Sequence, residues 1–530
     1  MLLFNRTNAP TAAALALGVL LMPSAALQAQ GAAAASAEAK PAAPKPAAPK
    51  SAPASAPKAA APKTPAAKAP AAGKAAEAGS GVKLPVLRRT LANGLRVVMS
   101  PDKTVPTTAV AIYYDVGSRD EQPGGSGFAH LFEHMMFQGS RNVGKGEHFQ
   151  LVMNRGGSAN GTTSHDRTNY YQTVPSNDLA LALWLEADRM RSLAITQDNF
   201  ENQRQTVMEE RRQSYDNSPY MKSMLRINEL AYGDYFPYAH STIGDMADLQ
   251  KAPLSAVQEF FDTYYAPNNA VLGIVGDFEP EAAMVLVEKY FGAIPKRSTR
   301  AFNAPPPAAQ KAERRESMSD PLAELPAFHI AYHIPPEHTD DHYPLDVLAM
   351  VLGDGESSRL YQQLVKGQEL LQEIDVNTDG RRGPDLFSVW AVCAKDKKAE
   401  AARAVIYEEL SAIAKRGIRD EELQKAKNRI RSYFVFGLQS NLQRAQRLAE
   451  FELYWGDPEL LNAEADRYLA VTVDDVKRVA GQYFAAENRT VLDVLPVAKA
   501  EPPAPAKAAD KADTTKKKGK QSAPAKGKQP

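Results

Sequence analysis

Two histidines and a glutamate in one short segment have the spacing of a metal site that carries its own base. Residues 127–137 have the apolar spacing of a helix and contain His130, Glu133 and His134. Side chains four positions apart project from one face of a helix, so the ring nitrogens of the two histidines can bind one Zn²⁺. Glu133 lies one turn after His130 and can take a proton from a water that the metal activates. The pattern H-x-x-E-H therefore predicts zinc-assisted hydrolysis with Glu133 as the general base.

Histidine is scarce in this chain, which argues against an accidental match to that pattern. Nine histidines occur among 530 residues. A single histidine on an apolar helix is most often a packing or surface residue, but a pair with a glutamate at these offsets favours a metal. His148, His165 and His240 have no partner at ligand spacing, so we expect packing or surface roles for them.

A third ligand must come from elsewhere, because catalytic zinc takes three protein ligands and keeps one open position. Thr196 is a good N-cap for a helix that runs toward residue 215. One stripe of that helix carries Phe200, Gln203, Val207 and Glu210. Glu209 instead belongs to a polar stripe, and we expect it to be solvated. An ordinary surface carboxylate is the alternative for Glu210, but its place on the apolar stripe favours a metal ligand.

Length, charge and cysteine content exclude several classes of function. A chain of 530 residues with 44% hydrophobic residues is too long for one compact core. The 63 basic and 62 acidic residues give a net charge of +1, so no overall field attracts nucleic acid. The one cysteine, Cys393, can form neither an intramolecular disulfide nor a thiolate cage by itself. Nitrogen and oxygen ligands must therefore hold any metal.

Both ends of the chain differ in composition from its centre. Residues 1–30 contain an early arginine, a short apolar run and then small residues, which is typical of a signal peptide. The apolar run is too short to span a bilayer, so we expect no transmembrane segment in the mature chain and export to the periplasm or another extracytoplasmic space. Residues 31–82 and 498–530 consist largely of Ala, Pro and Lys, a composition that predicts a disordered linker and a disordered tail.

The centre of the chain divides at a proline-rich break. We expect an N-terminal zinc domain at 83–296, a linker at 297–316 and a C-terminal domain at 317–497. Strand-like alternation occurs in both parts, at 95–100, 107–114, 328–334 and 386–392. The predicted fold class is α+β, with two similar domains that each pack helices on a mainly antiparallel sheet.

These motifs resemble the pitrilysin-type, insulinase-like zinc metallopeptidases, relatives of the beta subunit of the mitochondrial processing peptidase. The resemblance covers most of residues 84–497. In that family H-x-x-E-H is followed after about 75 residues by a helical glutamate in a Val-x-x-Glu setting, and here Val207 and Glu210 match it. The resemblance implies that the two domains form one half of a clam-shell, with zinc bound by His130, His134 and Glu210.

A second matching stretch, residues 157–170, is the sheet edge on which an extended peptide lies in relatives. Exposed edge strands offer unpaired amides that recognise a peptide backbone. Asn160 occupies a family-like N-x-x-T pattern and is a candidate for orienting the substrate. A turn-forming asparagine is the alternative.

The sequence departs from the family at two places. Relatives carry a glutamate where this chain has Gln203, which can hydrogen-bond but not ionise, so we expect it only to support the ligands. Relatives also carry, after a Ser-Arg-Leu segment, an arginine and a tyrosine that reach the substrate carbonyl. Here Val365 and Gln372 stand in those positions. We therefore expect a heterodimer whose second subunit resembles this chain, lacks the zinc motif and supplies the Arg/Tyr pair.

The predicted function is a zinc-dependent endopeptidase that cleaves peptides or unfolded polypeptides. A processing peptidase with one defined precursor is a second enzymatic reading. A non-catalytic assembly or peptide-binding subunit is the alternative outside enzymes, since some relatives serve as scaffolds.

Overall fold

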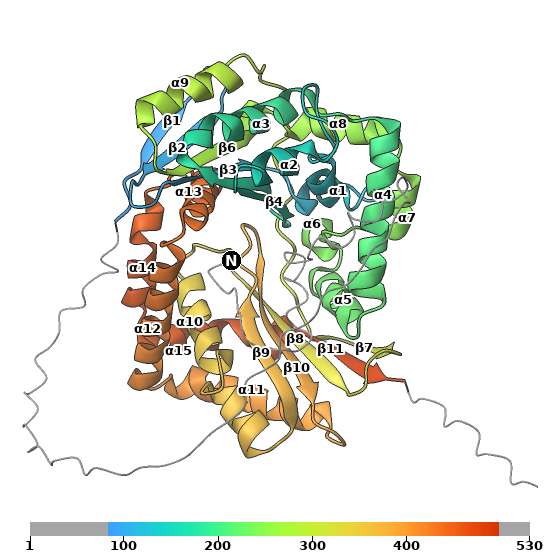
Figure 1. Cartoon of the computed structure of the whole chain (residues 1–530). Coiled ribbons are helices and arrows are strands. Elements are labelled where there is room, and N and C mark those ends of the chain that lie inside the picture. The colour runs from blue at the N-terminus through green and yellow to red at the C-terminus, as the bar shows by residue number, and fades with distance from the viewer. Residues whose placement is uncertain (1–82, 498–530) are drawn as a thin grey trace, which may run out of the picture.

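The computed structural model describes residues 83–497, in which two sheets with their helices lie one above the other (Figure 1). The α+β fold of two sheet-plus-helix halves, expected from the sequence, is confirmed. The predicted signal peptide, the Ala/Pro/Lys linker and the C-terminal tail lie outside the described residues.

The first sheet has six strands in the order β1-β2-β6-β3-β5-β4. Its strands are β1 (Leu87–Thr90), β2 (Arg96–Pro101), β3 (Thr107–Tyr114), β4 (Ser158–Thr163), β5 (Thr168–Pro175) and β6 (Ala270–Gly276). All neighbours are antiparallel except β2 and β6, which are parallel. β4 forms one edge of this sheet, and its only strand partner in the described chain is β5.

The second sheet has five strands in the order β7-β11-β8-β10-β9. Its strands are β7 (Arg314–Asp320), β8 (Ala327–Ile334), β9 (Leu371–Thr378), β10 (Asp385–Cys393) and β11 (Arg489–Pro496). Only the β7–β11 pair is parallel. Both sheets are therefore mainly antiparallel, as predicted, and the expected strands lie within one or two residues of β2, β3, β8 and β10.

Fifteen α-helices surround the two sheets in the described residues. They are α1 (Phe128–Met135), α2 (Glu147–Met153), α3 (Leu179–Ser192), α4 (Gln197–Arg211), α5 (Met221–Tyr232), α6 (Phe236–Ala239), α7 (Met246–Lys251), α8 (Leu254–Tyr264), α9 (Pro280–Phe291), α10 (His342–Gly353), α11 (Ala399–Arg416), α12 (Asp420–Gly437), α13 (Asn441–Trp455), α14 (Leu460–Ala470) and α15 (Val473–Tyr483). Short 3₁₀ turns are η3 (Ser118–Asp120), η4 (Ser176–Asp178), η6 (Pro267–Asn269) and η8 (Ala486–Asn488), and π-helical turns are η5 (Arg212–Asp216) and η7 (Tyr361–Gly367).

Each sheet is buried on both faces because its strands carry apolar residues at successive positions. In β3, Val110 and Ile112 join the core under α1 and α8, whereas Ala109 and Ala111 join the core under α13. The alternation follows from the period of two in a strand. The sheet that positions the candidate site is thus clamped between two helical layers.

The two halves exchange helices across their boundary. Helix α5 lies between β5 and β6 of the first sheet in sequence. Its Ile227 and Ala231 nevertheless pack in one cluster with Leu386 and Leu492 of the second sheet. Helix α13 comes from the second part of the chain, yet Leu448 packs in the core of the first sheet. Each half therefore covers a face of the other, and the two cannot separate without exposing apolar surface.

A polar contact also joins the halves at the turn between β9 and β10. The Arg382 guanidinium donates to Asp115 Oδ1 at 2.6 Å, and its backbone N–H donates to Asp166 Oδ2 at 3.1 Å. The hydroxyl of Tyr238 donates to Asp166 Oδ1 at 2.7 Å and accepts from the Gly383 N–H at 2.9 Å. This turn thereby contacts the β4–β5 turn, next to the edge strand of the first sheet.

A buried histidine holds the base of that turn. His342 Nε2 lies 2.9 Å from Asp385 Oδ2, and His342 Nδ1 lies 3.3 Å from Asp346 Oδ2. Both ring nitrogens face carboxylates, so both must be protonated. Burial by itself would lower the pKa of His342, but the two carboxylates outweigh it and hold the pKa well above its usual value.

Replacing His342 by glutamine should lower the free energy of unfolding by about 3–5 kcal/mol near neutral pH, because it leaves Asp346 without its cation and Asp385 with only Arg381, 4.0 Å away. The stabilisation by His342 is complete below its unfolded pKa, near 6.5, and is lost as the pH rises through the raised folded pKa. Urea unfolding at several pH values measures this. His333→Gln is the control, since His333 is half-buried and its Nε2 meets only the Ala231 carbonyl at 2.9 Å. Equal losses in the two variants would contradict the assignment.

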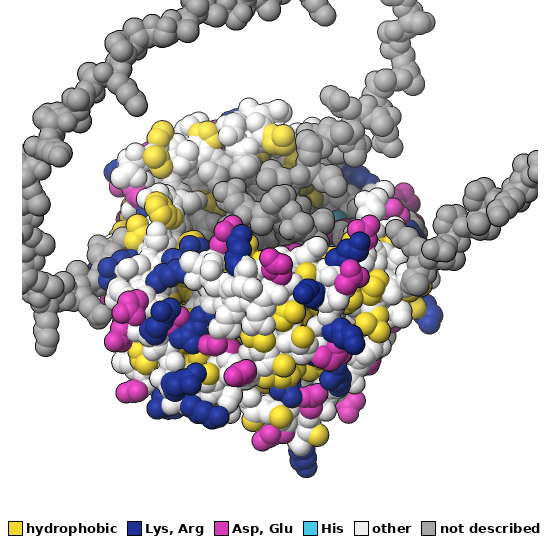
Figure 2. Space-filling model, turned by 90° about the horizontal axis from the view of Figure 1, so that it is seen from below, with side chains coloured by type: hydrophobic (Ala, Val, Ile, Leu, Met, Phe, Trp, Pro, Cys, Tyr) yellow, Lys and Arg dark blue, Asp and Glu magenta, His cyan; other side chains and the backbone are white. Residues whose placement is uncertain are grey.

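Charge on the outer face of the second half is mixed. Figure 2 shows basic and acidic side chains interspersed on this face. No helix within residues 83–497 has the length and apolar character needed to cross a membrane.

Candidate metal centre

Helix α1 carries the H-x-x-E-H pattern across its last turns. It begins after Gly127, whose φ of 91° lies in the left-handed region, and it ends at Met135. Phe128, Leu131 and Phe132 face the core of the first half, which fixes the rotation of the helix. His130 and His134 then project together from the opposite side, and their rings meet edge to face with centroids 4.9 Å apart.

Helix α4 brings the third predicted residue. Thr196 caps it as predicted, since its side chain accepts from the Asn199 N–H. Phe200 and Val207 are buried and anchor the stripe on which Glu210 lies. Glu209 points outward with half of its side chain exposed and pairs with Arg212 at 3.0 Å. The sequence-based distinction between the two adjacent glutamates thus agrees with their burial.

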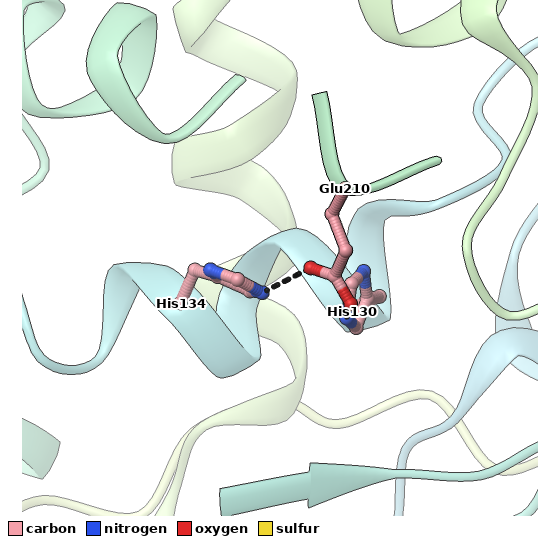
Figure 3. A group of neighbouring side chains, drawn as sticks. All are labelled: His130, His134 and Glu210. Carbon is pink, nitrogen blue, oxygen red and sulfur yellow. Dashed lines mark ion pairs between the residues drawn. The ribbon is translucent and has the colours of Figure 1, made fainter. Parts of the chain in front are cut away.

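The three side chains converge on one point (Figure 3). His134 Nε2 lies 3.3 Å from Glu210 Oε2, and His130 Nε2 lies 3.8 Å from Glu210 Oε1. One potential ligand atom from each residue lies within 4.8 Å of the others. Among the described residues this is the one group of at least three His, Cys, Asp or Glu side chains with such spacing.

The donor set fits zinc. Ligand bonds of about 2.0–2.1 Å in a tetrahedron place neighbouring ligand atoms about 3.4 Å apart, close to the two distances measured here. Two imidazole nitrogens and one carboxylate oxygen are a common ligand set for catalytic zinc. The Nε2 atoms face Glu210, while His130 Nδ1 is buried and has no hydrogen-bond partner in the described chain.

The electrostatics of the three groups favour a cation between them. Burial lowers the pKa of His130, and the neighbouring His134 lowers it further, so this ring is neutral. Burial would lower the pKa of His134 as well, but the hydrogen bond and charge of Glu210 outweigh it and raise the pKa. Burial would raise the pKa of Glu210, yet the two imidazoles hold it below the ordinary value. Zinc needs an ionised carboxylate and neutral imidazoles as ligands, so any proton on His134 is released when the ion binds.

Glu133 lies next to His134 on α1 and close to the edge strand β4. A Cβ added to Gly161 of β4 would lie 3.2 Å from Glu133 Cγ, so the glutamate side chain packs against the strand at this glycine. Thr163 of the same strand donates to the Ala129 carbonyl at 3.5 Å. Behind the helix, the Tyr170 hydroxyl donates to the Phe132 carbonyl at 3.0 Å. These contacts fix Glu133 at the junction of helix and strand.

Asn160 lies on β4, opposite Tyr171 of β5. Its amide oxygen accepts from the N–H of the next residue, Gly161, at 2.8 Å. This local bond is the kind expected of an asparagine that shapes its own backbone. The half-buried amide group donates no hydrogen bond that the structure records within the described chain.

Gln203 is buried on α4, two turns before Glu210. Its amide donates to Asn202 Oδ1 at 2.8 Å, and a hydrogen bond from its side chain is among the influences that raise the pKa of His134. The structure therefore places Gln203 against the ligand group, on the same stripe as Glu210.

The positions that carry the Arg/Tyr pair in relatives lie in the second half. Val365 is in η7 and packs against the second core, and Gln372 is an exposed residue of β9. The nearby Arg359 is held by Glu422 and Glu409, with a bidentate contact to Glu422 at 2.7 and 2.5 Å. Arg359 is thus committed to these carboxylates.

Three polar residues around the site were not found from the sequence. Glu121 accepts hydrogen bonds from the first turn of α1, His240 contacts Glu121, and the Arg211 side chain donates to the loop before α7. Only Glu121 had a signal in the sequence, because it is an acidic residue shortly before the start of α1. The other contacts join segments that are far apart in the chain.

Comparison with known proteins assigns the family. The model described as "Insulinase (Peptidase family M16)" matches residues 96–234, and the one described as "Peptidase M16 inactive domain" matches residues 251–430. The chain belongs to peptidase family M16. The first match contains His130, Glu133, His134 and Glu210, and the second covers the part of the chain without that pattern. The resemblance stated from the sequence is confirmed.

Named M16 relatives extend over almost the whole described chain. The "Zinc protease PqqE" of Helicobacter pylori is 32% identical over 413 residues, covering 77% of this chain and 92% of that protein. The crystal structure of a protease from Helicobacter pylori has a TM-score of 0.75 and 31% identity, and it covers 78% of this chain and all of that one. The periplasmic protease PqqL from Escherichia coli shares the fold, with a TM-score of 0.64, 19% identity, and coverage of 78% of this chain and 48% of that chain.

Proposed function

We propose that this M16 protein is a zinc-dependent endopeptidase that hydrolyses peptides or unfolded polypeptides. The convergence of His130, His134 and Glu210 from two helices carries the proposal. Zinc content of the purified protein and hydrolysis of a peptide panel test it together. A protein that binds zinc with these residues and cleaves no peptide in any assembly would contradict it.

Zinc, when bound, supplies Lewis-acid polarisation of the scissile carbonyl and lowers the pKa of a water toward neutrality. His130, His134 and Glu210 hold the ion, and the rest of the chemistry is done by the chain. Glu133 accepts a proton from the water as the water oxygen bonds to the carbonyl carbon, and it passes that proton to the amide nitrogen as the C–N bond breaks. Its place next to His134 and against β4 suits this role, because the water lies at the ion and the peptide is proposed to lie on β4.

The edge strand β4 is proposed to bind the substrate backbone. Its outer amides and carbonyls have no strand partner in the described chain, so an extended peptide can add to the sheet. Asn160 lies on this strand and orients the peptide through its amide group. Gln203 supports His134 by hydrogen bonding and takes no proton, because its amide does not ionise.

A second subunit is proposed to complete the site. Charge that develops on the scissile carbonyl needs hydrogen-bond donors besides the metal, and loss of one such donor costs about 3–4 kcal/mol. Val365 is apolar and packs against the core, Gln372 is a neutral amide, and Arg359 is held by two glutamates. The donors therefore come from another M16 chain that lacks H-x-x-E-H and carries the arginine and tyrosine.

Affinity purification of the chain from its native cells should recover that second chain in equal amounts. We expect the purified chain alone to cleave a fluorogenic peptide at least about a hundredfold more slowly than the pair, by the loss of donors. Mass spectrometry identifies the partner, and the comparison of kcat tests the need for it. Full activity of the chain alone, as a monomer or with itself, would contradict the proposal.

The alternative is a non-catalytic subunit that assembles with or presents peptides to another chain. The match of residues 251–430 to an inactive-domain description concerns only the part without the zinc pattern. The first half keeps His130, His134 and Glu210 in one cluster, with Glu133 on the same helix as the two histidines, which favours catalysis. Zinc stoichiometry separates the two functions.

The domain boundaries and location are also proposals. We assign the zinc domain to 83–296, the linker to 297–316 and the second domain to 317–497, although β7 already begins at Arg314. The signal-like N-terminal sequence and the printed description of PqqL as periplasmic both support export from the cytoplasm. Fractionation of cells with an antibody to the chain tests this.

A further inference from the structure

One segment contacts both of the helices that carry the metal-binding residues. It comprises residues 240–251, which include α7, and is called the bridging segment below. Helix α1 holds two of the three candidate ligands and α4 holds the third. The two helices contact each other directly, and the bridging segment adds a second connection between them.

Glu121 links the start of α1 to the bridging segment. Its carboxylate accepts from the Gly127 N–H and the Ala129 N–H, both at 2.8 Å, and lies 2.9 Å from His240 Nε2. The other nitrogen of His240 lies 2.6 Å from the Phe236 carbonyl, so both ring nitrogens face acceptors and both carry protons. Glu121 is 4% exposed, and its charge is thus matched by the histidine and the helix start.

The backbone of the bridging segment also packs directly on the start of α1. A Cβ added to Gly244 would lie 2.4 Å from Gly127 Cα, so only glycine allows the two chains to approach this closely. Asp248 accepts from the Ser126 hydroxyl at 2.7 Å, and the Ser126 oxygen accepts from the Asp245 N–H at 2.9 Å. The first turn of α1 therefore cannot shift without moving the segment.

Helix α4 contacts the other side of the same segment. Arg211, the residue directly after Glu210, donates to the Gly244 carbonyl. Two turns earlier on α4, Arg204 donates to the Gln250 carbonyl at 3.0 Å. Gly244 thus touches the start of α1 with its Cα and accepts from the residue next to Glu210 with its carbonyl.

We propose that Glu121 is a positioning residue which, through the bridging segment, sets the distance between the His130/His134 pair and Glu210. The proposal rests on the proposed zinc function. Helix α1 has eight residues and no capping bond from a side chain at its N-cap, so by itself it is poorly fixed. Metal ligands must be held to within a few tenths of an ångström for tight binding, and partners outside the ligands provide that precision.

Zinc release to a chromogenic chelator tests the proposal without relying on activity. Glu121→Ala should release zinc roughly tenfold to a hundredfold faster than the unmodified protein, the range known for residues that orient metal ligands. Glu121→Gln keeps one acceptor oxygen, and its rate of zinc release should lie between those of Glu121→Ala and the unmodified protein. Asp475→Ala is the control, because Asp475 also accepts a backbone N–H at a helix start, from Thr472 at 3.0 Å, but does so at α15.

Two further measurements separate positioning from mere loss of stability. The visible spectrum of the Co²⁺-substituted protein should change in Glu121→Ala, and kcat should fall with KM within about twofold. Arg211→Met removes the contact from the α4 side and should also accelerate zinc release. In the double variant with Glu121→Ala, Arg211→Met should accelerate zinc release by a smaller factor than it does alone, because both residues act through Gly244.

Each outcome decides between the two proposals. If the unmodified protein binds neither Zn²⁺ nor Co²⁺, the zinc function itself is wrong. If it binds them and Glu121→Ala releases zinc at the unmodified rate with an unchanged Co²⁺ spectrum, Glu121 has no positioning role. If Glu121→Ala does not fold, Glu121→Gln and Arg211→Met carry the test, and unmodified release rates in both would overturn the proposal.

Discussion

Replacing Glu133 by glutamine is expected to lower kcat for peptide hydrolysis by about 10²–10⁴-fold and to leave the zinc content unchanged. Glutamine has the shape of glutamate but cannot accept the proton of the attacking water. Glu133 is not among the three clustered ligand residues, so the ion should remain bound. A fluorogenic peptide assay on the complete assembly and metal analysis of the same sample measure both quantities.

The control for this variant is Glu147→Gln. Glu147 lies on α2, where its carboxylate accepts from the Gly144 N–H at 2.6 Å away from the ligand cluster, and its loss should leave kcat unchanged. Near-normal turnover by Glu133→Gln would remove Glu133 from the role of general base. Loss of zinc in that variant would instead make it a metal-binding residue.

Replacing Glu210 by alanine is expected to abolish both zinc retention and peptide hydrolysis. Loss of a residue that only orients a ligand already weakens metal binding roughly 10–100-fold, so loss of a ligand should exceed about a hundredfold. The hydrogen bond and charge of this carboxylate also raise the pKa of His134, and the variant loses both. Equilibrium competition with a chelator gives the affinity, and the peptide assay gives the rate.

The neighbouring glutamate supplies a matched control on the same helix. Glu209→Ala removes the same group one position earlier, where the side chain is 52% exposed and pairs with Arg212. Surface pairs of this kind contribute between about 0 and 1 kcal/mol to stability, so zinc affinity and kcat should remain at the unmodified level. If Glu209→Ala lost zinc and Glu210→Ala kept it, the third ligand would be misassigned.

Much of the local structure could be predicted from the chain. The stripe of Phe200, Val207 and Glu210 was readable because helical periodicity tells which side chains share a face. The apolar run at 107–114 predicted β3, which is buried on both faces. Such patterns report the buried side of an element, and they do so without knowledge of its neighbours.

The helix exchange between the halves was not readable. The sequence division at 297–316 gives no sign that α5 covers the second sheet or that α13 covers the first. Apolar stripes on these helices show that they are buried, but any apolar sheet face satisfies the same stripe. The choice between the two sheets depends on the shapes of both faces and on the lengths of the connections.

The sequence by itself determined the chemistry available to this protein, because His130, Glu133 and His134 share one helical face through the geometry of a single element. The sequence also indicated Glu210 as the third ligand, because it shares a helical stripe with apolar residues that must be buried. Only the tertiary structure decided that the two helices meet with Glu210 at 3.3 and 3.8 Å from the imidazoles, and that Glu121 and the bridging segment lie across their junction. Periodicity describes one element about its own axis, whereas the distance between two elements is set by packing among residues far apart in the chain.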